Sequence, residues 1–171
     1  MHNESLTGLV IAKNEATDLP GCLDFMTEVC AQVIVVDDSS TDSTVDIAKS
    51  YGCKILSTEM DETSGFMGLR NLGLDLVQTE MSFVMDPDER PDNTLVDSIR
   101  KAKIGNFYQV YRRNNVFGKR LDYGRFGQDH QVRLFPSITR YEGVVHEIPK
   151  LPHGAHVHHL EGTLNHYTYS C

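Results

Sequence analysis

The sequence predicts an α/β domain in which a parallel sheet is followed by a smaller antiparallel part. Two observations predict this class. Up to about residue 104, short apolar runs of strand length alternate with segments whose apolar residues recur at helical spacing. After that point, strand-like segments separated by loops replace the helical pattern. The length of 171 residues suits one domain with a sizeable core.

The first half alternates strand and helix four times. Short apolar runs at residues 6–12, 33–36, 53–57 and 81–85 predict buried strands. Helical spacing follows in residues 18–30, 42–51, 66–77 and 91–101. Asp18 can cap the first of these helices, with Pro20 in its first turn, and Gly52 ends the second. This order implies a parallel sheet with helices on both faces.

The second half predicts strands of a mixed or antiparallel sheet. They fall at residues 107–111, 116–121, 131–135 and 141–148, and residues 151–169 have room for one more hairpin. No internal repeat or low-complexity tract interrupts the chain. We therefore expect one continuous domain over residues 1–171.

Composition excludes several classes of function. The formal net charge of −8 argues against a nucleic-acid binder, which needs clustered Lys and Arg. No apolar run approaches the roughly 18–20 residues that cross a bilayer, and residues 1–7 are too polar for a signal peptide, so we expect a cytoplasmic protein. The four cysteines form no CxxC pair, which argues against a zinc site or a disulfide framework.

Polar side chains follow three of the predicted parallel strands, at residues 13–15, 37–38 and 86–89. Ligands of open parallel sheets bind beyond the carboxyl ends of the strands, so these groups are expected to meet at one edge. The alternative for any one cluster is a plain turn, which Asp and Asn favour. Three such clusters, each at the carboxyl end of a predicted parallel strand, weigh against that alternative.

The motif Asp86-Pro87-Asp88 carries the sharpest signal. Two carboxylates separated by one residue can point the same way from an extended turn, and Mg²⁺ or Mn²⁺ takes such oxygen ligands. Mg²⁺ often uses only one or two protein carboxylates and completes its shell with waters and substrate phosphates. The motif predicts a divalent metal that bridges the protein to a nucleotide diphosphate.

The second half supplies cations and titratable groups. Arginine forks suit a diphosphate, although most of the arginines at 112, 113, 120, 125 and 133 are expected to be solvated. Asp129 precedes a predicted strand and could serve as a general base, or it is a loop acid. His146 and Glu147 end another strand and could reach a metal or a substrate, or form a satisfied polar pair.

The histidine-rich tail does not predict a shared metal site. His156, His158 and His159 would fall on both faces of a strand, so they cannot all meet one ion. One of them, or His166, can still reach the site at the sheet edge.

Taken together, these segments resemble family 2 glycosyltransferases of the GT-A fold, a Rossmann-like α/β fold. Among them, the chain is similar to bacterial enzymes that add glucose or a related hexose to the inner core of lipopolysaccharide. The resemblance spans nearly the whole chain and keeps both order and spacing. The matching segments are Val10-Ile11-Ala12-Lys13-Asn14-Glu15, residues 34–44, Leu69-Arg70-Asn71-Leu72-Gly73, Met85-Asp86-Pro87-Asp88-Glu89-Arg90, residues 129–135, and Gly143-Val144-Val145-His146-Glu147.

The resemblance implies a role for each matching position. Residues 1–104 are expected to bind the nucleotide sugar, and residues 105–171 to form a short acceptor and catalytic half. Asp129 is where the resemblance places the base. The remaining implied assignments are the nucleotide site (Ala12, Asn14, Glu15, Asp38, Arg70, Asp86), the phosphate or substrate site (Arg133, Glu147) and the metal site (Asp86, Asp88, His146).

The reaction implied is transfer of a hexose from a nucleotide sugar, expected to be a UDP-sugar, to a hydroxyl of a glycan or glycolipid. Such enzymes invert the anomeric centre, so a β-linked product is expected. The base removes the acceptor proton, while Mn²⁺ or Mg²⁺ and an arginine stabilise the leaving diphosphate. Attachment to the inner membrane face stays an option.

Two departures from the family pattern matter. Many relatives read Asp-Ala-Asp-Glu where this chain has Pro87, which fixes φ and lacks an N–H, so a stiffer turn is expected. Relatives also continue beyond the segment that matches residues 166–169, which leaves the acceptor site more open to question than the donor site. Apolar surface left uncovered there could be buried by a second copy in a homodimer.

Two alternative functions stay open. A nucleotidyltransferase that makes sugar nucleotides would carry a glycine-rich loop after the first strand, where this chain has no glycine. A truncated module could bind nucleotide without turnover, or serve only to bind a partner.

Overall fold

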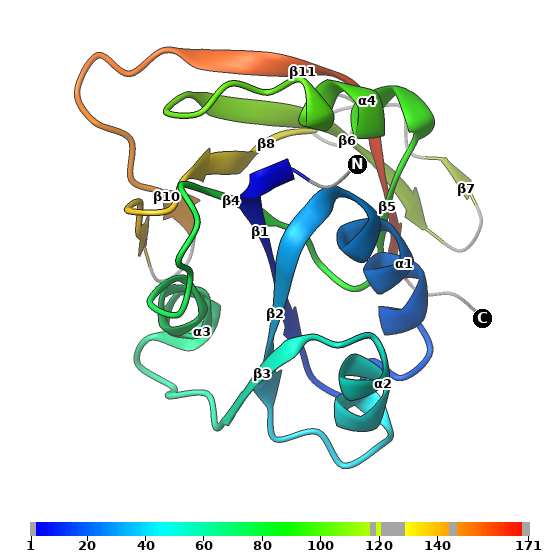
Figure 1. The fold of residues 1–171 in the computed structure, drawn as a ribbon. Helices are drawn as coiled ribbons and strands as arrows, with labels where there is room; N and C mark the ends of the chain where they lie inside the picture. Colours follow the sequence, from blue (N-terminus) through cyan, green and yellow to red (C-terminus); the bar gives the residue numbers. More distant parts are fainter. Residues whose placement is uncertain (1–2, 117–118, 121–128, 144–146, 169–171) are drawn as a thin grey trace.

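One mixed sheet runs through the chain (Figure 1). The structure, a computed structural model, describes residues 3–116, 119–120, 129–143 and 147–168. The parallel part of the sheet is ordered β3-β2-β1-β4 and consists of β1 (Asn3–Ala12), β2 (Cys30–Asp38), β3 (Lys54–Thr58) and β4 (Met81–Val84). The predicted parallel sheet is therefore confirmed.

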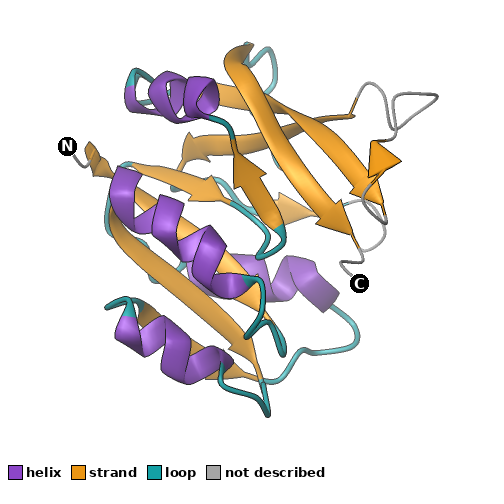
Figure 2. Cartoon of the chain, turned by 90° about the vertical axis from the view of Figure 1, so that its right-hand side faces the viewer, coloured by secondary structure: helices purple, strands orange, loops and turns teal. Residues whose placement is uncertain are grey.

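Helices cover both faces of this parallel part, as predicted. They are α1 (Leu19–Val29), α2 (Thr44–Ser50) and α3 (Gly65–Leu74), while α4 (Asn93–Arg100) packs against β11 in the second half of the sheet. Figures 1 and 2 show α1 and α2 on one face and α3 on the other. Each face buries its own apolar cluster, because strands between two helical layers present side chains to both sides.

The second half extends the same sheet. Its strands are β5 (Glu89–Pro91), β6 (Phe107–Val116), β7 (Lys119–Arg120), β8 (Asp129–Pro136), β9 (Tyr141–Glu142), β10 (Ile148–Pro149) and β11 (Val157–Thr168). β8 pairs antiparallel with both β4 and β6, and β11 pairs parallel with β6 and antiparallel with β5. The sheet is thus mixed, and the short β9–β10 pair forms a separate antiparallel ribbon.

Three predicted elements differ from the structure. Where a hairpin is predicted within residues 151–169, the described residues 151–168 contain the single long strand β11. Gly162 has φ 103° and lies at a register shift between His159 and Thr163, where a side chain would collide with the backbone of α4. Val116 ends β6 instead of starting a strand, and β9 and β10 replace the strand predicted over 141–148. The strand β5 is not predicted, because its three residues are too few to show the alternation of apolar and polar residues that marks a strand.

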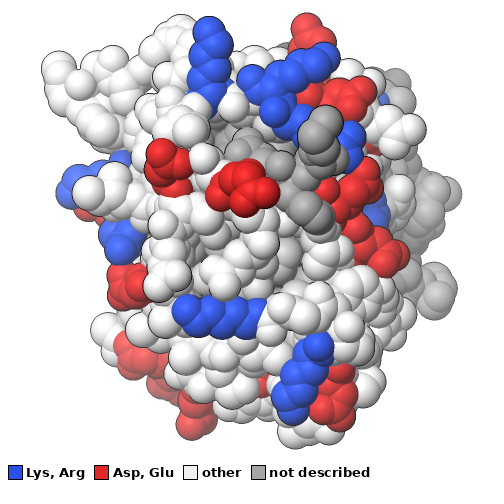
Figure 3. Space-filling view, viewed as in Figure 1, with Lys and Arg blue, Asp and Glu red and all other residues white. Residues whose placement is uncertain are grey.

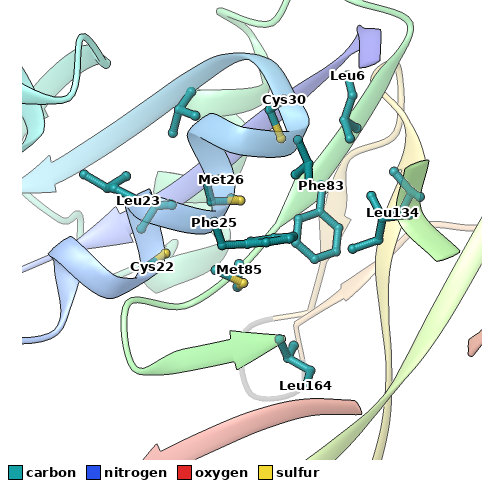
Figure 4. Packing of buried hydrophobic residues seen from close by; sticks show 14 of the residues in the cluster. Leu6, Cys22, Leu23, Phe25, Met26, Cys30, Phe83, Met85, Leu134 and Leu164 are labelled. Carbon is teal, nitrogen blue, oxygen red and sulfur yellow. The ribbon is translucent and has the colours of Figure 1, made fainter. Parts of the chain in front are cut away.

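The larger core lies between α1 and the sheet (Figure 4). The rings of Phe25 and Phe83 meet edge to face with centroids 6.1 Å apart, and Met26 is fully buried beside them. Leu134 of β8 and Leu164 of β11 join the same cluster. One core therefore connects the two halves of the sheet.

No helix in the described part of the chain is both long and apolar enough to cross a membrane. On the face shown in Figure 3, Lys and Arg are interspersed with Asp and Glu instead of gathering in one basic patch.

The packing of α3 on the sheet generates a prediction at Gly73. A Cβ atom placed there would lie 2.9 Å from Val36 and still closer to Leu9. We expect Gly73→Ala to lower the free energy of unfolding by about 1–3 kcal/mol, because overpacking outweighs the gain of about 1 kcal/mol in helix propensity. Urea denaturation measures the change.

The matched control is Leu72→Ala on the same helix, where the side chain is 44% exposed and the expected change is within about 0.5 kcal/mol. A Gly73→Ala protein as stable as the wild type would mean that α3 packs less closely than the structure shows.

Candidate functional site

A cavity of about 440 Å³ lies at the edge where β1 and β4 end. Four segments far apart in the sequence contribute to it: the ends of β1 and β4 with the loops that follow them, the start of α3, and the end of β11. The lining residues are Ile11, Lys13, Glu15, Phe66, Arg70, Asp86, Pro87, Asp88 and His166. The structure thus brings Glu15, Arg70, Asp86 and Asp88 together, as the sequence leads one to expect for a shared site.

The turn after β4 is closed by Glu89, which the sequence places at this edge of the sheet within residues 86–89 but to which it assigns no role. The Asp86 N–H donates to Glu89 Oε2 at 2.9 Å, and the Glu89 N–H donates to the Asp86 carbonyl at 3.1 Å. Glu89 is completely buried. Its place directly after the Asp-Pro-Asp motif was the available signal, but burial cannot be deduced from that position.

Arg133 of β8 binds both carboxylates of this turn, Asp86 and Glu89. Its Nη2 atom lies 2.9 Å from Asp86 Oδ2 and 2.7 Å from Glu89 Oε1, and the side chain is buried. Arg112 of β6 adds a longer contact of 3.5 Å to Glu89. Burial alone would raise the pKa of Asp86, but the charges of Arg133 and Arg70 outweigh it and hold the pKa below its usual range.

Arg70 of α3 separates this cavity from a second one of about 190 Å³. Its guanidinium pairs with Glu147, reaches Asp86 Oδ1 at 3.4 Å and lies over the ring of Tyr141, 5.3 Å from the centroid. Glu147, predicted to contact phosphate or substrate, is thus an arginine partner here. Arg112, Arg133 and Gln131 also line the second cavity.

Asp88 and His166 face each other at the wall of the first cavity. His166 Nε2 lies 3.2 Å from Asp88 Oδ2, and His166 Nδ1 lies 2.8 Å from Asn114 Oδ1. Among the described residues, no three His, Cys, Asp or Glu side chains are arranged as a ready-made metal site. The carboxylate of Asp86 contacts Arg70 and Arg133 instead of pointing toward Asp88 and His166. His146, the predicted metal ligand, lies outside the described residues.

The predicted nucleoside residues lie at the ends of β1 and β2 and in the loop that follows β1. Asp38 is buried and accepts from Lys13 Nζ at 2.9 Å and from the Met60 N–H at 2.8 Å, and the hydrogen bond from Lys13 is the main cause of its lowered pKa. The Asn14 side chain accepts from the Thr41 N–H at 2.8 Å. These bonds join the loops after β1 and β2.

Neither Asn14 nor Asp38 lines the cavity, and Ala12 is a buried residue of β1. Their proximity to the cavity fits the predicted site, while their nucleotide contacts stay a prediction.

Glu15 lies in a crowded acidic environment. Burial raises its pKa to about 7, with further contributions from the negative charges of Asp88, Asp18, Asp42 and Asp86. Such crowding is unfavourable for an empty cavity and becomes favourable when a cation enters it.

Asp129, the predicted base, is the first residue of β8 and lines neither cavity described above. Its carboxylate accepts from Gln131 and Arg112 at 2.7 Å each and from Asn114 at 3.2 Å. Burial raises its pKa, but these donors outweigh burial and lower it, so the group is ionised at neutral pH. Its catalytic role stays a prediction.

Comparison with known proteins supports the family suggested by the sequence. The chain matches the model of Glycosyl transferase family 2 over residues 9–157. It is 31% identical over 93 residues to the lipopolysaccharide core biosynthesis glycosyltransferase LpsC of Rhizobium meliloti, a match that covers 53% of this chain and 34% of that protein. The chain spans about a third of the length of the curated relatives it matches.

Solved structures show the same fold. The 1–349 fragment of TarS from S. aureus has a TM-score of 0.57 at 15% identity, covering 78% of this chain and 47% of that one. Glucosyl-3-phosphoglycerate synthase from Mycobacterium tuberculosis, solved with Mn²⁺, UDP-glucose and phosphoglyceric acid, has a TM-score of 0.50 at 16% identity, covering 64% and 44%. The likeness shows the GT-A fold expected from the sequence.

The buried turn predicts that Glu89 is essential for stability. Glu89→Ala leaves Arg133 with one carboxylate in place of two, and we expect the free energy of unfolding to fall by about 3–5 kcal/mol, the usual effect of breaking a buried pair. Glu89→Gln keeps an acceptor for Arg133 and should cost less. Urea denaturation compares both with Glu80→Ala, an exposed control. Equal stability of Glu89→Ala and Glu80→Ala would contradict the role assigned to the pair.

The raised pKa of Glu15 predicts a pH-dependent stability in metal-free buffer. Between pH 4.5 and 7 the folded protein retains a proton that the unfolded chain releases, so ionisation of Glu15 lowers stability as the pH rises through this window. Glu15→Gln removes the effect. We expect this variant to exceed the wild type by about 1 kcal/mol at pH 8, since the carboxylate is partly solvated, and to match it near pH 4.

Thermal unfolding with EDTA at both pH values measures this difference. A gap between Glu15→Gln and the wild type that is the same at pH 4 and pH 8 would rule out ionisation of Glu15 as its cause.

Proposed function

Since this chain belongs to glycosyl transferase family 2, we propose that it transfers a hexose from a nucleotide sugar to a hydroxyl group of a glycan or lipopolysaccharide-type acceptor. The observation that carries the proposal is the 440 Å³ cavity in which the Asp-Pro-Asp motif meets arginine and histidine side chains. A UDP-sugar is the proposed donor, in line with the UDP-glucose bound to the mycobacterial synthase. The lipopolysaccharide-type acceptor follows the name of LpsC.

Asp88 and His166 are the side chains that we propose to hold a divalent cation, with Asp86 turning toward it. The residues fit such an ion, because Mg²⁺ and Mn²⁺ prefer carboxylate oxygens and Mg²⁺ commonly needs only one or two of them beside phosphates and waters. The acidic crowding around Glu15 also favours a cation at this place. When bound, the ion offsets the charge that develops on the leaving diphosphate.

Arg70 and Arg133 are the proposed diphosphate contacts. Both now pair with carboxylates, and a diphosphate offers the same kind of oxygen acceptors to a guanidinium fork. When Asp86 turns toward the cation, each arginine loses one carboxylate partner. The phosphate oxygens then replace that partner, so the arginines stay paired throughout binding.

The acceptor oxygen attacks the anomeric carbon as the bond from that carbon to the diphosphate breaks, and we propose that the acceptor proton passes to Asp129. Attack from the face opposite the diphosphate converts an α-linked donor into a β-linked product. Asp129 must exchange one of its three donors for the acceptor hydroxyl to do this. An Asp129→Asn protein that binds donor normally and keeps the full transfer rate would exclude this role.

Calorimetry of donor binding tests the proposed donor site. We expect UDP or a UDP-sugar to bind in the presence of Mn²⁺ and to bind at least about tenfold more weakly with EDTA or in Asp88→Ala. The matched control is Asp97→Ala, which removes an exposed carboxylate of α4 and should bind as the wild type does. GDP and dTDP are compared in the same way to identify the base.

Metal-independent binding would exclude the proposed role of Asp88. Failure of the wild type to bind any of the three nucleotides would favour the alternative in which the protein is not an enzyme and serves only to bind a partner.

A further inference from the structure

We propose that Asn114 is a positioning residue for the cation, because it fixes which nitrogen of His166 carries the proton. It does so in a relay from Asp129 through Asn114 to His166, which leaves the Nε2 lone pair of His166 directed at Asp88. This inference rests on the proposed metal site. It adds Asn114 and Asp129, which act on the metal through His166.

The relay consists of three contacts between side chains. Asn114 Nδ2 donates to Asp129 Oδ2 at 3.2 Å, Asn114 Oδ1 lies 2.8 Å from His166 Nδ1, and His166 Nε2 lies 3.2 Å from Asp88 Oδ2. Asn114 is buried, with only 5% of its surface exposed. The Thr168 hydroxyl, at 3.4 Å from both ring nitrogens, is too distant to determine the orientation of the imidazole.

Asp129 determines how the amide of Asn114 is oriented. A carboxylate that receives Arg112 and Gln131 at 2.7 Å each is ionised and can only accept, so the amide must present its NH₂ group to it. The carbonyl oxygen of Asn114 is then the atom that faces His166.

The proton of His166 follows from the same logic. An amide oxygen only accepts, so Nδ1 must be the donor of the 2.8 Å contact. In the neutral ring, Nε2 is then an acceptor. It faces a carboxylate oxygen across 3.2 Å, and two acceptors at this distance repel each other unless a proton or a metal ion lies between them. The relay therefore prepares Nε2 to ligate a cation together with Asp88.

Strand pairing explains why these residues meet. In the parallel pair β6–β11, His166 is the register partner of Asn114, and in the antiparallel pair β5–β11 it is the partner of Glu89. The Tyr167 N–H donates to the Asp88 carbonyl at 3.0 Å, which ties β11 directly to the Asp-Pro-Asp turn. The orientation of the imidazole is thus set by three neighbouring strands.

A purely structural role for Asn114 makes a different prediction from the relay. Asn114→Asp keeps an oxygen acceptor for His166 Nδ1 but places a second carboxylate beside Asp129. If Asn114 only satisfies buried partners, this variant is the most damaging one. If Asn114 acts through the tautomer of His166, Asn114→Asp retains metal binding and Asn114→Leu loses it.

The experiment titrates Mn²⁺ into each protein in the presence of UDP and records the electron paramagnetic resonance of the bound ion. Coupling of the Mn²⁺ electron spin to an imidazole nitrogen reports ligation by a histidine, and its dependence on Asn114, the partner of His166 Nδ1, assigns that histidine as His166 and not His146. We expect this coupling in the wild type and in Asn114→Asp, and its loss in Asn114→Leu together with a 10- to 100-fold lower Mn²⁺ affinity, roughly the usual effect of removing an outer-shell partner. Gln109→Leu, which replaces another amide side chain of β6 at a position paired with His159 instead of His166, is the matched control and should bind as the wild type does.

Each outcome bears on a different statement. An Asn114→Leu protein that is folded by circular dichroism and keeps both coupling and affinity overturns the inference. Wild-type protein that binds Mn²⁺ and UDP without nitrogen coupling also overturns it, but leaves the proposed function standing. Wild-type protein that binds neither Mn²⁺ nor UDP overturns the proposed function, and the inference with it.

Discussion

The ion pair between Glu89 and Arg133 joins the parallel and antiparallel parts of the sheet at the candidate site. Glu89 begins β5, Arg133 lies on β8, and both are buried. Buried charges are tolerated only when they are paired, so the pair fixes the distance between the turn after β4 and β8. Glu89 also receives the Asp86 N–H and is the register partner of His166. The geometry of the site therefore depends on one carboxylate that does not line the cavity.

The arginines of the site are paired with carboxylates, but the carboxylates outnumber them. Arg70, Arg112 and Arg133 each contact carboxylates, while Glu15 and Asp88 remain beside them in a cavity with excess negative charge. A cation satisfies the acids and a diphosphate satisfies the arginines, but either ligand alone leaves one set of charges poorly paired. We therefore expect the affinities for metal and nucleotide to be positively coupled, and such coupling is reciprocal.

The sequence predicts the first four strands and their helices because their apolar runs are buried whatever the remainder of the chain does. The meeting of Glu15, Asp86 and Asp88 follows from sheet topology alone. His166 and Asn114 are different, because their contact depends on the register between strands about fifty residues apart in sequence. The hairpin predicted within residues 151–169 differs from the single strand β11 for the same reason: the positive φ of Gly162 serves close packing against α4, which only the tertiary structure reveals.

Pro87 lies in the middle of the Asp-Pro-Asp turn, and the structure shows why the turn accepts a proline. The N–H groups that close the turn belong to Asp86 and Glu89, so the N–H that proline lacks is not required. The Pro87 carbonyl accepts from Arg90 Nη1 at 2.6 Å, and Arg90 also binds the Asp18 carbonyl at 2.6 Å. These bonds hold the loop between β4 and β5 against the start of α1. Asp88 is therefore positioned by its backbone before any ligand binds, which reduces the entropy lost when a metal and a nucleotide enter.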